Sequence, residues 1–178
     1  MIDPPPEIAL VCGSRSLAQG GQDVEVWARH MIECISDHAD VIVTGDAPGP
    51  DTWARERVQT LARESLRGRV YDLRGYVCDA WGTPLGRWSS HAPSGPSDPR
   101  WRRWPLERNA AMVRAVALRA RREGRPASVH ALVDPRSRTQ GTMHTVTLAR
   151  AMGLRAYVHR WDPESLACQR TLDRTTDL

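Results

Sequence analysis

Residues 41–51 (VIVTGDAPGPD) constrain the fold most, because a short apolar run stops at a turn and a helical pattern follows. Three β-branched residues in a row, 41–43, predict a strand buried on both faces, which is typical of a parallel sheet between helices. Asp51 is expected to be the N-cap of a helix over 52–66 and to accept the amide of Ala54. The stretch therefore predicts exposed amides at the carboxyl edge of a sheet, where open α/β folds bind ligands.

Strand and helix patterns alternate along the rest of the chain. Apolar runs predict strands at 7–12, 41–43, 68–73, 127–133 and 153–158, and helical periodicity predicts helices at 23–37, 52–66, 105–122 and from about 142 to 152. The apolar stripes of the first and third helices are Val24, Trp27, Met31, Ile35 and Leu106, Ala110, Val113, Ala117. This alternation predicts an α/β, Rossmann-like, doubly wound fold: a mainly parallel five-stranded sheet with helices on both faces.

The length of 178 residues suits a single domain, 1–178, that folds without disulfide or metal staples. Its core is expected at 7–158, with a tail at 159–178. Residues 74–104 are rich in Gly, Pro, Ser and Trp and show no periodicity, so they are interpreted as a lid or a poorly ordered insertion.

The charge and the cysteines bear on ligands and location. All 25 basic residues are Arg, and the net charge of +4 favours an anionic ligand or nucleic acid. The four cysteines lack metal-site spacing, and Cys12 and Cys34 fall in predicted core positions, as expected of reduced thiols. With no signal peptide and no membrane-spanning run, we expect a cytoplasmic protein that does not bind membranes.

Three loops that follow strands should meet at one sheet edge. After the first strand, the amides of Gly13 and Ser14 and the guanidinium group of Arg15 could wrap an anion, although an ordinary turn is the alternative. The loop after the fourth strand carries hydroxyls beside a helix N-terminus and is the best phosphate-binding loop. Its candidate ligand-binding residues are Ser137, Thr139, Gly141 and Thr142.

The loop at 45–51 differs because it carries two acids. Repulsion between the negative charge of Asp46 or Asp51 and a phosphate bound a few ångströms away would disfavour binding by about 1–4 kcal/mol. The residues Gly45, Asp46, Gly49 and Asp51 are therefore assigned to ribose or base contacts, with helix capping as the alternative for Asp51.

Two further basic segments follow. Arg108 and Asn109 lie in the first turns of the third helix, from which their side chains could reach the same edge. Residues 100–104 (RWRRW) interleave Arg and Trp as single-stranded nucleic acid binders do, and a solvated loop pinned by its Trp side chains is the alternative.

Four short motifs in order resemble the SLOG superfamily, in particular its YspA-like branch: residues 12–15 (CGSR), 44–51 (TGDAPGPD), 108–112 (RNAAM) and 141–142 (GT). The resemblance covers residues 8–158. It implies a Rossmann-like fold with a nucleotide or nucleotide-derived ligand in the pocket formed by these loops. Some members belong to bacterial or phage conflict systems.

The resemblance extends to related SLOG groups with other activities. Cytokinin-activating phosphoribohydrolases carry a catalytic Glu within their glycine-rich motif. Residues 141–145 (GTMHT) of this chain have no carboxylate at that point, which leaves Asp46 or Asp134 as the nearby acids. His144 could be a base or a structural residue. DNA-processing DprA-type domains imply a third reading, in which single-stranded nucleic acid binds.

The leading hypothesis is therefore binding or sensing of a nucleotide or nucleotide-derived ligand, with N-glycosidic hydrolysis of a nucleotide and single-stranded nucleic acid binding as alternatives. No catalytic residue is assigned, no cofactor or metal is expected, and a homo-oligomer is left open.

Overall fold

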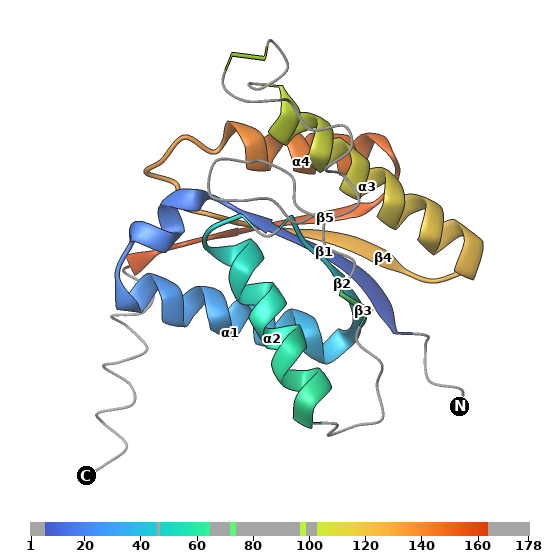
Figure 1. The fold of residues 1–178 in the computed structure, drawn as a ribbon, viewed down its shortest axis with the longest axis horizontal. Coiled ribbons are helices and arrows are strands. Elements are labelled where there is room, and N and C mark those ends of the chain that lie inside the picture. Colours follow the sequence, from blue (N-terminus) through green and yellow to red (C-terminus); the bar gives the residue numbers. More distant parts are fainter. Residues whose placement is uncertain (1–5, 46, 65–71, 74–96, 99–102, 164–178) are drawn as a thin grey trace.

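The computed structural model describes residues 6–45, 47–64, 72–73, 97–98 and 103–163 (Figure 1). The elements in chain order are β1 (Glu7–Gly13), the 3-10 helix η1 (Arg15–Gln19), α1 (Gln22–His38), β2 (Ala39–Val43), α2 (Pro50–Glu64), β3 (Asp72–Leu73), α3 (Trp104–Glu123), β4 (Ala127–Val133), α4 (Gln140–Ala151) and β5 (Arg155–Arg160). Most of the 74–104 insertion and the tail from 164 onward lie outside the described residues.

The strands form one sheet in the order β3-β2-β1-β4-β5, and each neighbouring pair is parallel. Four strands of five to seven residues make up most of this sheet. β3 contributes only Asp72 and Leu73, and residues 68–71 of the predicted third strand are outside the described part of the chain. The prediction of an α/β fold with a parallel sheet and helices is confirmed.

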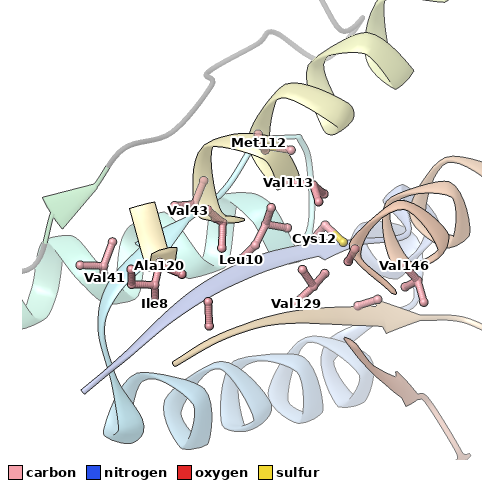
Figure 2. Packing of buried hydrophobic residues seen from close by; sticks show 14 residues of the cluster. Ile8, Leu10, Cys12, Val41, Val43, Met112, Val113, Ala120, Val129 and Val146 are labelled. Carbon is pink, nitrogen blue, oxygen red and sulfur yellow. The ribbon is translucent and has the colours of Figure 1, made fainter. Parts of the chain in front are cut away.

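Each face of the sheet is covered by its own pair of helices (Figure 1). On one face, Leu10 and Val129 pack against Met112 and Val113 of α3 and Val146 of α4 in one buried cluster (Figure 2). On the other face, the buried residues of α1 and α2 pack against Ala9, Val11, Ile42 and Leu132. The alternation of β1 produces both clusters, because successive side chains of a strand point to opposite faces.

Two of the predicted apolar stripes are partly wrong. In α1, Ala28 and Ile32 are buried, whereas Trp27 and Met31 are half-buried and pack at the margin of the cluster. In α3, Leu106 is 38% exposed although Val113 and Ala117 are buried. A stripe read at a spacing of three or four can be shifted by one residue around the helix, and only packing against the sheet determines which side is covered.

The prediction for Cys34 is also wrong: Cys12 is buried, but Cys34 is exposed on α1. Among the described residues, no helix is both long and apolar enough to cross a membrane.

The strand order reverses at one point of the sheet. The chain proceeds outward from β1 to β2 and β3, and α3 then returns it to β4 on the other side of β1. In open α/β sheets, ligands bind beyond the carboxyl ends of the strands where the order reverses in this way. That point lies between the ends of β1 and β4.

Candidate functional site at the carboxyl edge of the sheet

The carboxylate of Asp51 joins the loop after β1 to the loop after β2. Its Oδ1 accepts the amide of Gly13 at 3.1 Å, and its Oδ2 accepts the amides of Gly45 at 3.2 Å and Ala47 at 3.4 Å. The Asp51 carbonyl also accepts the hydroxyl of Thr44 at 3.1 Å. Three backbone donors from two loops therefore converge on one side chain that is 2% exposed.

Asp51 has a different structural role from the one predicted. It is the second residue of α2, not the N-cap, because the helix begins at Pro50. Its carboxylate reaches back to residues 13, 45 and 47 instead of accepting the amide of Ala54. The sequence signal for a cap and for this cluster is the same, since both need a short acceptor side chain beside unpaired amides.

Burial makes the charge of Asp51 costly. Burial raises the pKa of Asp51 to about 6, while the Arg108 charge and the three amides lower it in part. The thiol of Cys12 lies in the same environment, and burial raises its pKa, with the negative charge of Asp51 adding to the effect. The site is therefore a low-dielectric one in which unpaired charge is expensive.

Arg108 and Asn109 connect this cluster to α4. The guanidinium group of Arg108 donates to the carbonyl of Gly45 at 3.3 Å and to Oδ1 of Asn109 at 2.9 and 3.2 Å. The amide of Asn109 donates in turn to the carbonyl of Gly141, in the first turn of α4, at 3.3 Å. As predicted, both side chains of α3 reach the sheet edge, but Arg108 is 5% exposed and is part of the framework of the site.

Two glycines permit this close packing. A Cβ atom at Gly45 would lie 2.8 Å from Cζ of Arg108 and 2.9 Å from Oδ2 of Asp51. A Cβ atom at Gly13 would lie 2.3 Å from Cγ of Pro50. All three distances are shorter than van der Waals contact, so the loops can meet only where a side chain is missing.

Ser14 lies where β1 and β4 end, and its amide donates to the carbonyl of Leu132 at 2.9 Å. Its backbone remains extended (φ −72°, ψ 129°), so strand alternation places its side chain on the same face as Cys12, the face that α4 covers. Ser14 is 4% exposed, and within the described part of the chain its buried Oγ has no hydrogen-bond partner. Buried hydroxyls are normally paired, so an unpaired one at this point is a candidate ligand contact.

Two hydroxyls tie the loop after β1 to the loop after β4. The Oγ of Ser16, in η1, donates to the Oγ of Ser137 at 2.7 Å. Ser137 is among the predicted site residues and Ser16 is not, and an anion-binding loop, with an ordinary turn as the alternative, is predicted where η1 forms. The hydroxyl at position 16 was visible in the sequence, but nothing local to it indicated a partner 121 residues away.

The loop at 134–142 is less basic than its sequence suggests. Asp134 accepts both the amide and Nε of Arg136 at 3.0 Å. Burial tends to raise the pKa of Asp134, but the hydrogen bonds from Arg136 hold this pKa below its ordinary value of 3.8. Arg136 therefore neutralises the one acid of this loop. Thr139 is the N-cap of α4 without a side-chain hydrogen bond to it, and the first turn of α4 contains no acidic residue.

The structure thus brings together Gly13, Ser14, Gly45, Asp51, Arg108, Asn109, Ser137, Gly141 and Thr142 from four segments at one sheet edge. Arg15 is exposed, and Gly49 is buried in the turn before α2. Asp46 and residues 100–102 lie outside the described residues. Within the described ranges, no group of three or more His, Cys, Asp or Glu side chains could hold a metal ion.

The fold and this edge define an α/β protein in which polar groups gather where parallel strands end. Comparisons of the chain with protein-family models, with curated proteins and with solved structures found no match.

Gly45→Ala should destabilise the protein by about 1–3 kcal/mol, because its methyl group would displace the buried Arg108 and Asp51 side chains. Gly141→Ala is the matched control. It has open space within 4 Å and lies in α4, so it should be neutral or stabilising by up to about 1 kcal/mol. Urea unfolding of the two variants measures the difference, and equal stabilities would contradict the packing described for Gly45.

Asp51→Asn should alter how stability depends on pH. The pKa of Asp51 rises from 3.8 to about 6 on folding. Ionisation of Asp51 therefore leaves the free energy of unfolding unchanged below pH 3.8 and lowers it by the full amount above pH 6. The wild-type free energy of unfolding minus that of Asp51→Asn should therefore fall, by on the order of 3 kcal/mol, as pH rises through this window.

Asp134→Asn serves as the control of opposite sign. The pKa of Asp134 is lowered in the folded state, so its contribution is present at neutral pH and is lost only as pH falls below about 3.8. Urea unfolding between pH 3 and 8 follows both variants. A flat difference for Asp51→Asn between pH 4 and 6 would show that the Asp51 carboxylate is not buried as described.

Proposed function

We propose that the protein binds or senses a nucleotide or nucleotide-derived ligand at the carboxyl edge of the sheet, as a SLOG-type domain of the YspA-like branch. The proposal includes the finer fold assignment, a five-stranded, doubly wound, Rossmann-like sheet in a cytoplasmic protein of a bacterial or phage conflict or signalling system. The four motifs that resemble the family support it. Their residues come from separate segments of the chain and lie at one sheet edge.

The observation that carries the proposal is the buried Oγ of Ser14, which has no hydrogen-bond partner in the described part of the chain and lies at the sheet edge from which α4 starts. A phosphate oxygen there would accept the Ser14 hydroxyl and the free amides of the first turn of α4, and the helix dipole would favour its charge. No acid of that first turn opposes it. Ser137 and Thr142 would flank the phosphate from the loop and the helix.

The two described acids near the edge, Asp51 and Asp134, fit this proposal better than a catalytic one. The negative charge of Asp51 is buried among three amides and near Arg108, and Asp134 is paired with Arg136. An N-glycosidic hydrolase would need a carboxylate that is accessible to water or to a leaving base. Hydrolysis of a nucleotide is the alternative function. Chromatographic detection of the free base after incubation with a nucleotide is the assay for it.

Thermal unfolding with mono-, di- and cyclic nucleotides and with ADP-ribose tests the proposal. A ligand at about 100 times its dissociation constant should add roughly 2.7 kcal/mol of stability, because it binds only the folded state. No shift with any of these ligands would refute nucleotide binding. Tight binding of single-stranded DNA that weakens steeply with salt would favour the nucleic acid alternative instead.

Ser14→Ala tests the position of the phosphate. We expect ligand affinity to fall about 2- to 13-fold, the equivalent of 0.5–1.5 kcal/mol for one hydrogen bond. Stability without ligand should be unchanged or higher, because the variant removes an unpaired buried hydroxyl. Isothermal titration calorimetry and urea unfolding provide the two readouts.

Ser36→Ala is the matched control, since Ser36 is equally buried but lies in α1, where its hydroxyl donates to the carbonyl of Glu33 at 2.8 Å. It should lose about 0.5–1.5 kcal/mol of stability and keep its affinity. If Ser14→Ala binds nucleotide as tightly as the wild type, the placement of the phosphate is wrong even though nucleotide binding stands.

A further inference from the structure

A buried negative charge lies close to the place proposed for the phosphate. Oδ1 of Asp51 accepts the amide of Gly13 at 3.1 Å, and Ser14 is the next residue of the chain. Backbone dimensions therefore put the Ser14 hydroxyl within about 10 Å of this carboxylate oxygen. Burial and then the negative charge of Asp51 raise the pKa of the Cys12 thiol, which lies on the same face of the sheet as Ser14. An anion bound at Ser14 would be exposed to the same charge.

The groups around Asp51 do not offset a second negative charge. The charge of Arg108 lowers the pKa of Asp51, but burial outweighs it, so this pKa is about 6. When both side chains are ionised, Asp51 and Arg108 together carry no net charge, and Asp134 at the end of β4 is already paired with Arg136. A phosphate would add an unbalanced charge to a buried site, which is unfavourable.

The surrounding elements contribute few other groups that can titrate or carry charge. The first turn of α4, residues 140–143, contains none. In the described part of the chain, the remaining ones on neighbouring segments are Cys12 of β1, Arg15 of η1, Arg55 one turn further along α2, and the exposed His144 of α4. Of these, His144 is the one with an ordinary pKa in the range of pH 5 to 8, so a test must separate it from Asp51.

We propose that binding of a phosphate-bearing ligand at Ser14 is coupled to protonation of Asp51. This inference rests on the proposed function and names how pH regulates the same site. The proton comes from solvent and is held on Oδ1, which accepts one amide, whereas Oδ2 accepts two. The neutral carboxyl group no longer repels the phosphate, so the proton and the ligand stabilise each other.

The size of this coupling follows from the separation of the two charges. A unit negative charge about 10 Å away raises the pKa of a carboxyl group by about one unit at an intermediate dielectric constant. Because the pKa of Asp51 without ligand is about 6, the proton is taken up mainly between pH 6 and about pH 7. Ligand affinity should therefore be highest below pH 6 and should fall by up to about tenfold as pH rises to 8.

Titration calorimetry in buffers of different ionisation enthalpy measures the number of protons taken up on binding. Cyclic AMP and ADP-ribose are suitable ligands, because they lack the terminal phosphate that itself titrates near pH 6. We expect uptake of about half a proton per ligand near pH 6.5, and almost none at pH 5 or pH 8, where Asp51 has the same protonation state with and without ligand.

Two variants assign the proton to a residue. Asp51→Asn should bind without proton uptake and with the same affinity from pH 5 to pH 8, whereas His144→Gln should keep the uptake of the wild type. If Asp51→Asn does not fold, the wild-type protein provides the test. The common midpoint of the amide shifts of Gly13, Gly45 and Ala47 should rise by about one pH unit when the ligand saturates the site.

The outcomes separate this coupling from nucleotide binding itself. Binding without proton uptake, or uptake that is lost in His144→Gln and kept in Asp51→Asn, would overturn the coupling while nucleotide binding stands. An amide midpoint that does not move on saturation would overturn it as well. If neither ligand nor any other nucleotide binds between pH 5 and pH 8, the proposed function fails and the coupling fails with it.

Discussion

The carboxylate of Asp51 is the contact on which the carboxyl edge of the sheet depends. It accepts amides from residues 13, 45 and 47, so the loops after β1 and β2 are held against the start of α2 by one side chain. Removing an acceptor from a buried amide leaves that amide unpaired, at a cost of about 1–3 kcal/mol each. The position of both loops therefore depends on Asp51 more than on any local turn.

The rest of the edge follows from the cost of burying this charge. Arg108 brings a positive charge close to Asp51, and its guanidinium group spans Gly45 and Asn109, which in turn contacts the first turn of α4. Glycine is required at 45 because the two charged groups pass within 3 Å of its Cβ position. The charged residues of the cluster thus support one another, while the hydroxyl of Ser14 has no hydrogen-bond partner in the described part of the chain.

Much of the framework could be predicted from the sequence, because it is encoded locally. The apolar run at 127–133 predicts β4 with its observed bounds, and the alternation of patterns predicts a parallel sheet whose loops meet. The role of Asp51 could not be predicted, since its partner at Gly13 is 38 residues away and the sequence indicates only that an acceptor stands at a helix start. The Ser16–Ser137 contact and the unpaired Ser14 likewise arise from packing between segments.

Two neighbouring histidines on β4 and β5 show the same limit. His130 and His159 are 29 residues apart and become neighbours only through the register of β4 and β5. Cys34 shows the converse, because an apolar residue type in a helical pattern predicts burial, whereas the rotation of α1 on the sheet exposes it. Periodicity identifies an element and its approximate buried side, and tertiary contact determines the rest.

The central claim is that one buried carboxylate holds amides from two loops, and a nuclear magnetic resonance titration tests it most directly. The amide proton shifts of Gly13, Gly45 and Ala47 should change together as pH is varied, with one common midpoint near the Asp51 pKa of about 6. All three changes should vanish in Asp51→Asn. Separate midpoints, or a titration that persists in the variant, would contradict the account.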